Sequence, residues 1–102
     1  MIVLLSEVPV SSTTRAAAAE ILREMAVRSR EEPGVIDYRV TRDLEQPDTF
    51  RIVERYEDAA AVEAHESSSH LEEFQRAIEP HLDGEPELYR YDVAERTEMV
   101  GP

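Results

Sequence analysis

The chain contains no cysteine, lysine, asparagine or tryptophan, and only three of its 102 residues are glycine. The absence of cysteine excludes disulfides, thiolate metal sites and cysteine nucleophiles. The few glycines form neither a phosphate-binding loop nor a dinucleotide-binding fingerprint. The apolar run within residues 1–7 has no basic segment before it and no small-residue cleavage site after it. We therefore expect a strand there, no membrane span and a cytoplasmic location.

Positive charge is also scarce. The chain has 23 acidic and 11 basic residues, all of the latter arginine, and its net charge is -12. Without a basic run to displace counterions, binding to nucleic acid or to an anionic membrane is not expected. The acidity has two open interpretations: a well-solvated surface, or adaptation to high salt, which would screen the repulsion between carboxylates.

Length and punctuation indicate one domain covering residues 1–102, without repeats or an interdomain linker. The expected order is strand, helix, two strands, helical segment and strand. Alternating apolar residues and turn signals place the four strands at residues 2–8, 35–42, 49–57 and 86–93. Residues 95–102 form a polar tail, which is either frayed or docked on a partner.

Each helical segment has its own boundary signals. The first follows possible capping hydroxyls at residues 11–13 and should end just before Pro33 and Gly34. Asp58 can cap the second, which three serines at 67–69 interrupt; Ser69 and Glu72 match a capping box. We expect two short helices or one bent helix there. The apolar face of the first helix comprises Ala18, Ile21, Leu22 and Met25.

This β-α-β-β-α-β order predicts an α+β, ferredoxin-like protomer with a four-stranded antiparallel sheet. Both helical regions then cover one face of the sheet and leave the other open. Two such open faces packed together would bury apolar surface and enclose a barrel-like interior. We therefore expect a homodimer formed through the sheet faces.

Two histidines in the second helical segment are candidate functional groups. His65 follows Val62 by three residues and so could face inward, either as a satisfied core histidine or as a base or donor in a pocket. His70 could merely support the start of the later helix. Five residues apart, they would lie roughly 140° apart on an unbroken helix, which makes them poor joint metal ligands unless the serine break reorients them. No metal site is predicted.

Glu54 is the other candidate. Strand alternation puts its carboxyl on the same face as Phe50, Ile52 and Tyr56. It is either paired, most simply with Arg39 on the neighbouring strand, or a carboxyl whose raised pKa lets it accept a substrate proton. Tyrosines could line a cavity for a flat ring, although tyrosine is also an ordinary strand residue. These tyrosines are Tyr38, Tyr56, Tyr89 and Tyr91.

The stretch from Glu32 to Phe74 combines a Pro-Gly stop, a tyrosine strand, a Phe-x-x-x-Glu-x-Tyr strand and a His-x4-His-Leu-x-x-Phe helix. In this order and spacing it resembles the antibiotic biosynthesis monooxygenase domain, and within that family the quinol-monooxygenase-like branch. The resemblance implies a dimeric α+β barrel with a pocket between sheet and helices in each protomer. Haem degradation is not expected, since the asparagine and tryptophan of that branch are missing here.

By this resemblance, the protein is a cofactor-independent monooxygenase of a small aromatic quinol or polyphenol, which it deprotonates for direct reaction with dioxygen. His65 would be the base or donor, and Glu54 or Arg39 would stabilise charge. Two alternatives stay open: a non-catalytic dimer that binds a small aromatic molecule, and an isomerase or lyase of the same superfamily. The remaining residues that would contact substrate are Tyr38, Tyr56, His70 and Phe74.

Overall fold

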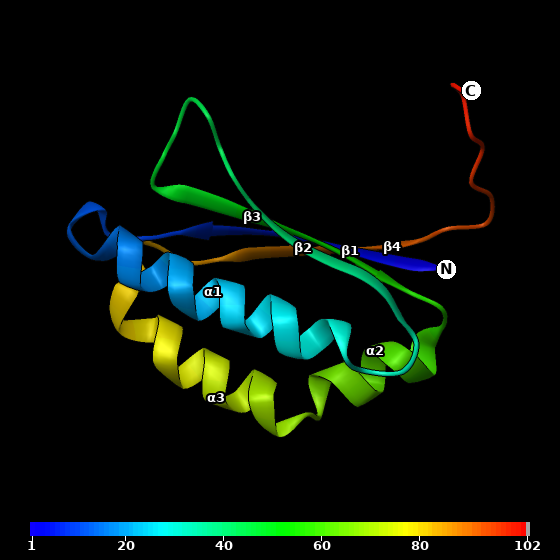
Figure 1. Cartoon of the computed structure of the whole chain (residues 1–102), viewed down its shortest axis with the longest axis horizontal. Coiled ribbons are helices and arrows are strands. Elements are labelled where there is room, and N and C mark those ends of the chain that lie inside the picture. Colours follow the sequence, from blue (N-terminus) through cyan, green and yellow to red (C-terminus); the bar gives the residue numbers. More distant parts are fainter. Residues whose placement is uncertain (102) are drawn as a thin grey trace.

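A computed structural model describes residues 1–101, so the last residue of the expected tail, 102, lies outside the described part. The strands are β1 (Ile2–Pro9), β2 (Val35–Arg42), β3 (Thr49–Tyr56) and β4 (Glu87–Asp92). They form one antiparallel sheet in the order β2-β3-β1-β4, with β1 and β3 in the centre. The helices α1 (Arg15–Arg30), α2 (Ala59–Glu66) and α3 (Ser69–Ile78) all lie on one face of the sheet (Figure 1). The predicted ferredoxin-like fold is confirmed.

The strand faces follow the predicted alternation. In β3, Phe50, Ile52, Glu54 and Tyr56 are all buried beneath the helices, whereas the residues between them point to the uncovered face. Cross-strand pairing extends this division to β1, where Leu4 lies opposite Glu54 and Leu5 opposite Val53. Because side chains alternate along a strand, one face of the sheet carries the core and the other is open.

The first helix buries much of its predicted apolar face. Ala18, Leu22 and Met25 pack into the main core, and Ile21 lies at its margin. The capping prediction was less accurate, since Ser11 caps a short 3₁₀ turn (Ser12–Thr14) and α1 itself begins without a side-chain cap. The helix ends at Arg30, ahead of the expected Pro-Gly stop.

The helical segment after β3 is two short helices. Asp58 caps α2 by accepting a hydrogen bond from the Ala61 N–H, as predicted. The predicted capping box at Ser69 is wrong by one residue, because the Ser68 hydroxyl accepts from the Leu71 N–H and Ser69 is already helical. Ser67 and Ser68 also donate to carbonyls of the last turn of α2, and these bonds help to end that helix. The break fixes a change of direction between α2 and α3.

The last strand departs from one expectation. Tyr89 and Tyr91 of β4 pair with Leu5 and Val3, so they lie on the open face of the sheet and both are about half exposed. They do not share a cavity with Tyr38 and Tyr56, which are buried under the helices. The tail after β4 has no regular structure up to residue 101 and extends away from the sheet (Figure 1). Within the described part of the chain, none of the helices combines the length and apolar character of a bilayer span.

Candidate functional site

A cavity of about 760 Å³ lies between the covered face of the sheet and α3. Its floor comes from β1 and β3, and its walls come from α2, α3 and the segment that leads into β4. The lining surface is largely apolar, and Glu54 and His65 are its buried polar groups. Further polar side chains of the lining are Ser6, Glu66, Gln75, Glu79, Glu85 and Glu87. The other apolar or aromatic lining residues are Leu4, Val8, Tyr38, Ile52, Leu71, Phe74, Ile78, Leu82 and Leu88.

Glu54 lies at the floor of this cavity with only 4% of its surface exposed. The Tyr56 hydroxyl donates a hydrogen bond to its Oε1 at 2.6 Å. Desolvation by burial raises the pKa of Glu54, and the Tyr56 hydrogen bond and nearby His65 only partly oppose that effect. Burial likewise raises the pKa of Tyr38 and of Tyr56, with the Glu54 charge as the next cause, so both phenols stay neutral. The Glu54 carboxyl is therefore predisposed to carry a proton.

His65, at the end of α2, is as buried as Glu54. Its ring is tilted against Tyr38 and Tyr56, with centroid distances of 5.7 and 5.6 Å. The Nδ1 atom lies 2.9 Å from Glu32 Oε2, and Nε2 lies 3.8 Å from Glu54 Oε1. The two ring nitrogens thus face different carboxyl groups.

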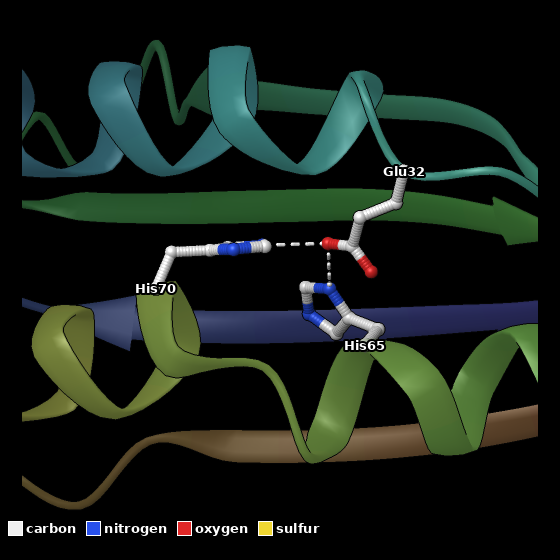
Figure 2. Close-up of side chains that lie close together, drawn as sticks. All are labelled: Glu32, His65 and His70. Atoms are coloured by element: carbon white, nitrogen blue, oxygen red, sulfur yellow. Dashed lines mark hydrogen bonds and ion pairs between the residues drawn. The ribbon is translucent and has the colours of Figure 1, made fainter.

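Glu32 also binds His70, whose Nε2 is 2.6 Å from the same Oε2 atom. Figure 2 shows this oxygen between the two imidazoles, with Glu32 coming from the turn after α1 and the histidines from α2 and α3. An unbroken helix would have separated the histidines widely, and the break at Ser67 and Ser68 brings them together. Sequence reasoning did not select Glu32 as a site residue, because only the packing of α3 beside α1 places it there.

An ionised Glu32 would fix one tautomer for each of the two histidines. An ionised carboxylate can only accept, so Glu32 receives the Nδ1–H of His65 and the Nε2–H of His70. A neutral His65 that donates from Nδ1 has its lone pair on Nε2, which points towards Glu54 and the cavity. In this tautomer the site presents an unprotonated ring nitrogen of His65 beside Glu54, a carboxyl with a raised pKa.

Arg39 does not take part in this site. Its Nε atom is 2.8 Å from Asp37 Oδ1, its side chain is 63% exposed, and the β2 residue opposite Glu54 is Tyr38. The predicted pairing of Glu54 with Arg39 is therefore wrong. A register irregularity between Val35 and Asp37 explains the difference, because a one-residue shift turns every later side chain of β2 to the other face.

The remaining predicted residues divide between two regions. Tyr38 and Phe74 line the cavity, and Tyr56 lies beneath it as the hydrogen-bond partner of Glu54. His70 instead lines a groove between α1 and α3, on the other side of the Glu32 carboxylate. Glu32, His65 and His70 also form the group of side chains in the described chain that could hold a metal ion, with one ligand atom from each within 4.8 Å of the others.

Comparisons with known proteins agree with this architecture. A sequence model described as Antibiotic biosynthesis monooxygenase matches residues 1–77. Among solved structures, a provisionally assigned antibiotic biosynthesis monooxygenase from Deinococcus radiodurans has a TM-score of 0.91 at 24% identity and covers 99% of this chain and 100% of its own.

Two further structures are somewhat more similar in sequence. A Bacteroides thetaiotaomicron protein of unknown function, described as a possible oxidoreductase, is 29% identical with a TM-score of 0.82, covering 88% of this chain and 94% of its own. A Pseudomonas aeruginosa protein is 26% identical with a TM-score of 0.82, covering 91% and 94%. No curated protein matches the chain significantly.

Proposed function

Because the chain belongs to the antibiotic biosynthesis monooxygenase family, which supports a general monooxygenase-like role, we propose that it oxygenates a small aromatic quinol or polyphenol without a cofactor. One observation carries the proposal: Glu32 holds the Nδ1 side of His65, so that Nε2 faces an apolar cavity as a hydrogen-bond acceptor. Such a nitrogen can remove a phenolic proton.

The cavity suits a neutral aromatic substrate. Phe74, Leu71 and Ile52 supply apolar surface for a flat ring, and the volume of about 760 Å³ lies within the range of small-molecule pockets. No arginine of the described chain lines it, so nothing there attracts an anionic substrate. The substrate would enter as the neutral phenol and lose its proton inside.

Proton transfer from the phenol to His65 Nε2 creates an imidazolium next to a phenolate. The Glu32 carboxylate, 2.9 Å from Nδ1, stabilises that imidazolium. Glu54 already accepts a hydrogen bond from Tyr56 on Oε1, which leaves its other oxygen to donate when the group is protonated. A neutral Glu54 would thus stabilise a developing oxyanion without adding negative charge.

The oxygenation step balances without another reductant. The quinol anion supplies four electrons to dioxygen. One oxygen atom replaces a hydrogen on a ring carbon, and the other leaves as water. For a hydroquinone the product is the hydroxyquinone. The contribution of the protein is to orient the ring and take the proton.

A second function has its own support. His65 Nε2 and Glu54 Oε1 lie 3.8 Å apart at one cavity wall, which is the arrangement that a proton shuttle needs. Such a pair would serve an isomerase that moves a proton between two positions of a carbonyl substrate. Product formed under strictly anaerobic conditions would assign the site to this chemistry.

Oxygen uptake with a panel of hydroquinones and polyphenols tests the monooxygenase. Chelator-treated protein should consume oxygen, and His65→Gln should lower kcat by about 100-fold or more, the usual contribution of a general base. His81→Gln is the matched control, because the cavity lining includes Glu79 and Leu82 of this segment but not His81 itself. Equal loss in both variants, or no uptake by the wild type across the panel, would reject the proposal.

We further propose that the protein acts as a homodimer joined through the open sheet faces. Val53, Tyr89 and Tyr91 are apolar or aromatic, lie on that face and are between one third and just over one half exposed. A monomer seldom leaves such a group of side chains in water.

A further inference from the structure

The Glu32, His65 and His70 cluster brings one carboxylate oxygen and two imidazole nitrogens together. Glu32 is largely buried, with 13% of its side chain exposed, and within residues 1–101 it has no arginine partner. The Oε2 atom of Glu32 contacts one nitrogen of each imidazole. A buried carboxylate is costly unless a cation or several hydrogen-bond donors compensate it.

We propose that Glu32 Oε2, His65 Nδ1 and His70 Nε2 form a binding site for a divalent transition metal, for which zinc is the best match. Two imidazole nitrogens and one carboxylate oxygen are ligands that zinc prefers, whereas magnesium and calcium prefer oxygen alone. Three protein ligands would leave one tetrahedral position for water.

The present distances are compatible with such a site. The Glu32 oxygen is 2.9 Å from one nitrogen and 2.6 Å from the other, and all three atoms lie within 4.8 Å of each other. Ligand atoms bound to one zinc ion at about 2.0–2.2 Å lie roughly 3.3 Å apart in a tetrahedron. Side-chain shifts on the order of 1 Å would convert the hydrogen-bonded cluster into a coordinated one.

A metal ion can also reach the cluster from solvent. His70 lines a groove of about 180 Å³ between α1 and α3, where Glu24 and Glu73 lie as well. The side chains of Glu32 and His70 are 13% and 14% exposed, whereas His65 is closed off at 4%. Cations would therefore enter past His70, drawn by the acidic surface.

The position of the cluster indicates what the metal would do. Only His65 of the three lines the substrate cavity, so a metal on its Nδ1 would lie behind the imidazole and out of contact with a substrate there. Coordination at Nδ1 moves the remaining proton of the neutral ring to Nε2. Metal binding would thus remove the acceptor that faces the cavity, and, as far as the proposed oxygenase function holds, zinc would inhibit turnover.

Zinc titration by calorimetry of chelator-treated, desalted protein tests the site without any substrate. The buffer would contain excess magnesium, which fills weak carboxylate sites on the acidic surface so that they do not bind zinc. The expected result is one zinc per chain with a dissociation constant below the micromolar range. Cobalt(II) in place of zinc should give the visible absorption of a tetrahedral nitrogen and oxygen site.

Substitutions separate this site from surface binding. His70→Gln and Glu32→Gln should each weaken zinc by about 100-fold or more, since losing even an outer-shell partner costs about 10- to 100-fold. His81→Gln, which changes the remaining histidine of the chain, should bind as tightly as the wild type. Thermal unfolding without metal would verify that each variant is folded. Absence of a one-to-one site in the wild type, or equal weakening by His81→Gln, would overturn the proposal.

Discussion

Glu54 and His65 are equally buried, yet their surroundings give them different properties. The carboxyl lies against apolar side chains with a tyrosine hydroxyl as its hydrogen-bond donor, and burial raises its pKa. The imidazole lies between two tyrosine rings, and a carboxylate on the far side of the ring holds its proton. A carboxyl with a raised pKa beside an imidazole at one cavity is typical of acid and base pairs.

Glu54→Gln should change how stability depends on pH. In the wild type the native state binds the Glu54 proton more tightly than the unfolded state, since burial raises the pKa above its ordinary value. The free energy of unfolding should therefore fall as pH rises from that ordinary value through the raised one. Burial is the largest cause of the raised pKa; Tyr56 and His65 oppose it, and the charges of Glu32 and Glu66 add to it.

Chemical denaturation at a series of pH values measures this effect. The wild type should gain stability over Glu54→Gln as the pH is lowered, whereas the exposed Glu98→Gln in the tail should follow the wild type. Parallel curves for wild type and Glu54→Gln would contradict a raised pKa.

At the scale of helices and strands, sequence patterns predicted the features that depend on neighbouring residues, namely strand faces and helix caps. The alternation in β3 predicted which of its residues are buried, and Asp58 predicted the start of α2. The serines predicted the break between α2 and α3 to within one residue. The register irregularity in β2 has no sequence signature of that kind, so the predicted pairing of Arg39 with Glu54 was wrong. His65 and His70 both contact Glu32 because of how α3 packs beside α1. The periodicity of a single helix does not reveal such packing.

Gly34 fixes how α2 sits on the sheet. Its φ of 85° is in the left-handed region, and a Cβ there would lie 2.7 Å from the Cβ of Ala61 in α2. Gly34→Ala should therefore destabilise the fold by about 2 kcal/mol or more, from backbone strain and overlap together. It should also lower turnover, because α2 carries His65.

The Gly34 effect can be measured by denaturation with two comparisons. Gly101→Ala should be neutral, since nothing lies within 4 Å of that position. Adding Ala61→Gly to Gly34→Ala should recover the steric part of the loss, visible as a favourable coupling in a double-mutant cycle. Simple additivity of the two changes would argue against the close contact.

For the whole molecule, the open sheet face and the surface charge have opposite effects on association. Apolar and aromatic side chains of β1, β3 and β4 favour pairing of two chains, while each chain brings a net charge of -12. The balance depends on ionic strength, because salt screens repulsion between exposed carboxylates without weakening apolar contacts.

Val53→Asp should convert the proposed dimer into a monomer, since it places a charge in the middle of the open face. Sedimentation equilibrium measures the mass. Leu44→Asp is the matched control, because Leu44 is 97% exposed in the β2–β3 connection and should leave the dimer intact. A monomeric wild type, or a Val53→Asp variant that still dimerises, would refute the sheet-face interface.

Salt should stabilise the assembly if the acidity is an adaptation to high ionic strength. The melting temperature should then rise from low to molar potassium chloride, as repulsion between the two acidic chains is screened. A melting temperature that stays unchanged over this range would favour the simpler interpretation of a well-solvated acidic surface.

The tautomer of His65 tests the account most directly. Nitrogen-15 chemical shifts of the histidine rings, recorded at neutral pH on chelator-treated protein, distinguish a protonated from an unprotonated ring nitrogen. With Glu32 holding Nδ1–H, we predict a protonated Nδ1 and an unprotonated Nε2, and the Nδ1 shift should change in Glu32→Gln but not in His81→Gln. A proton on Nε2 of His65 in the metal-free wild type would contradict the proposed base.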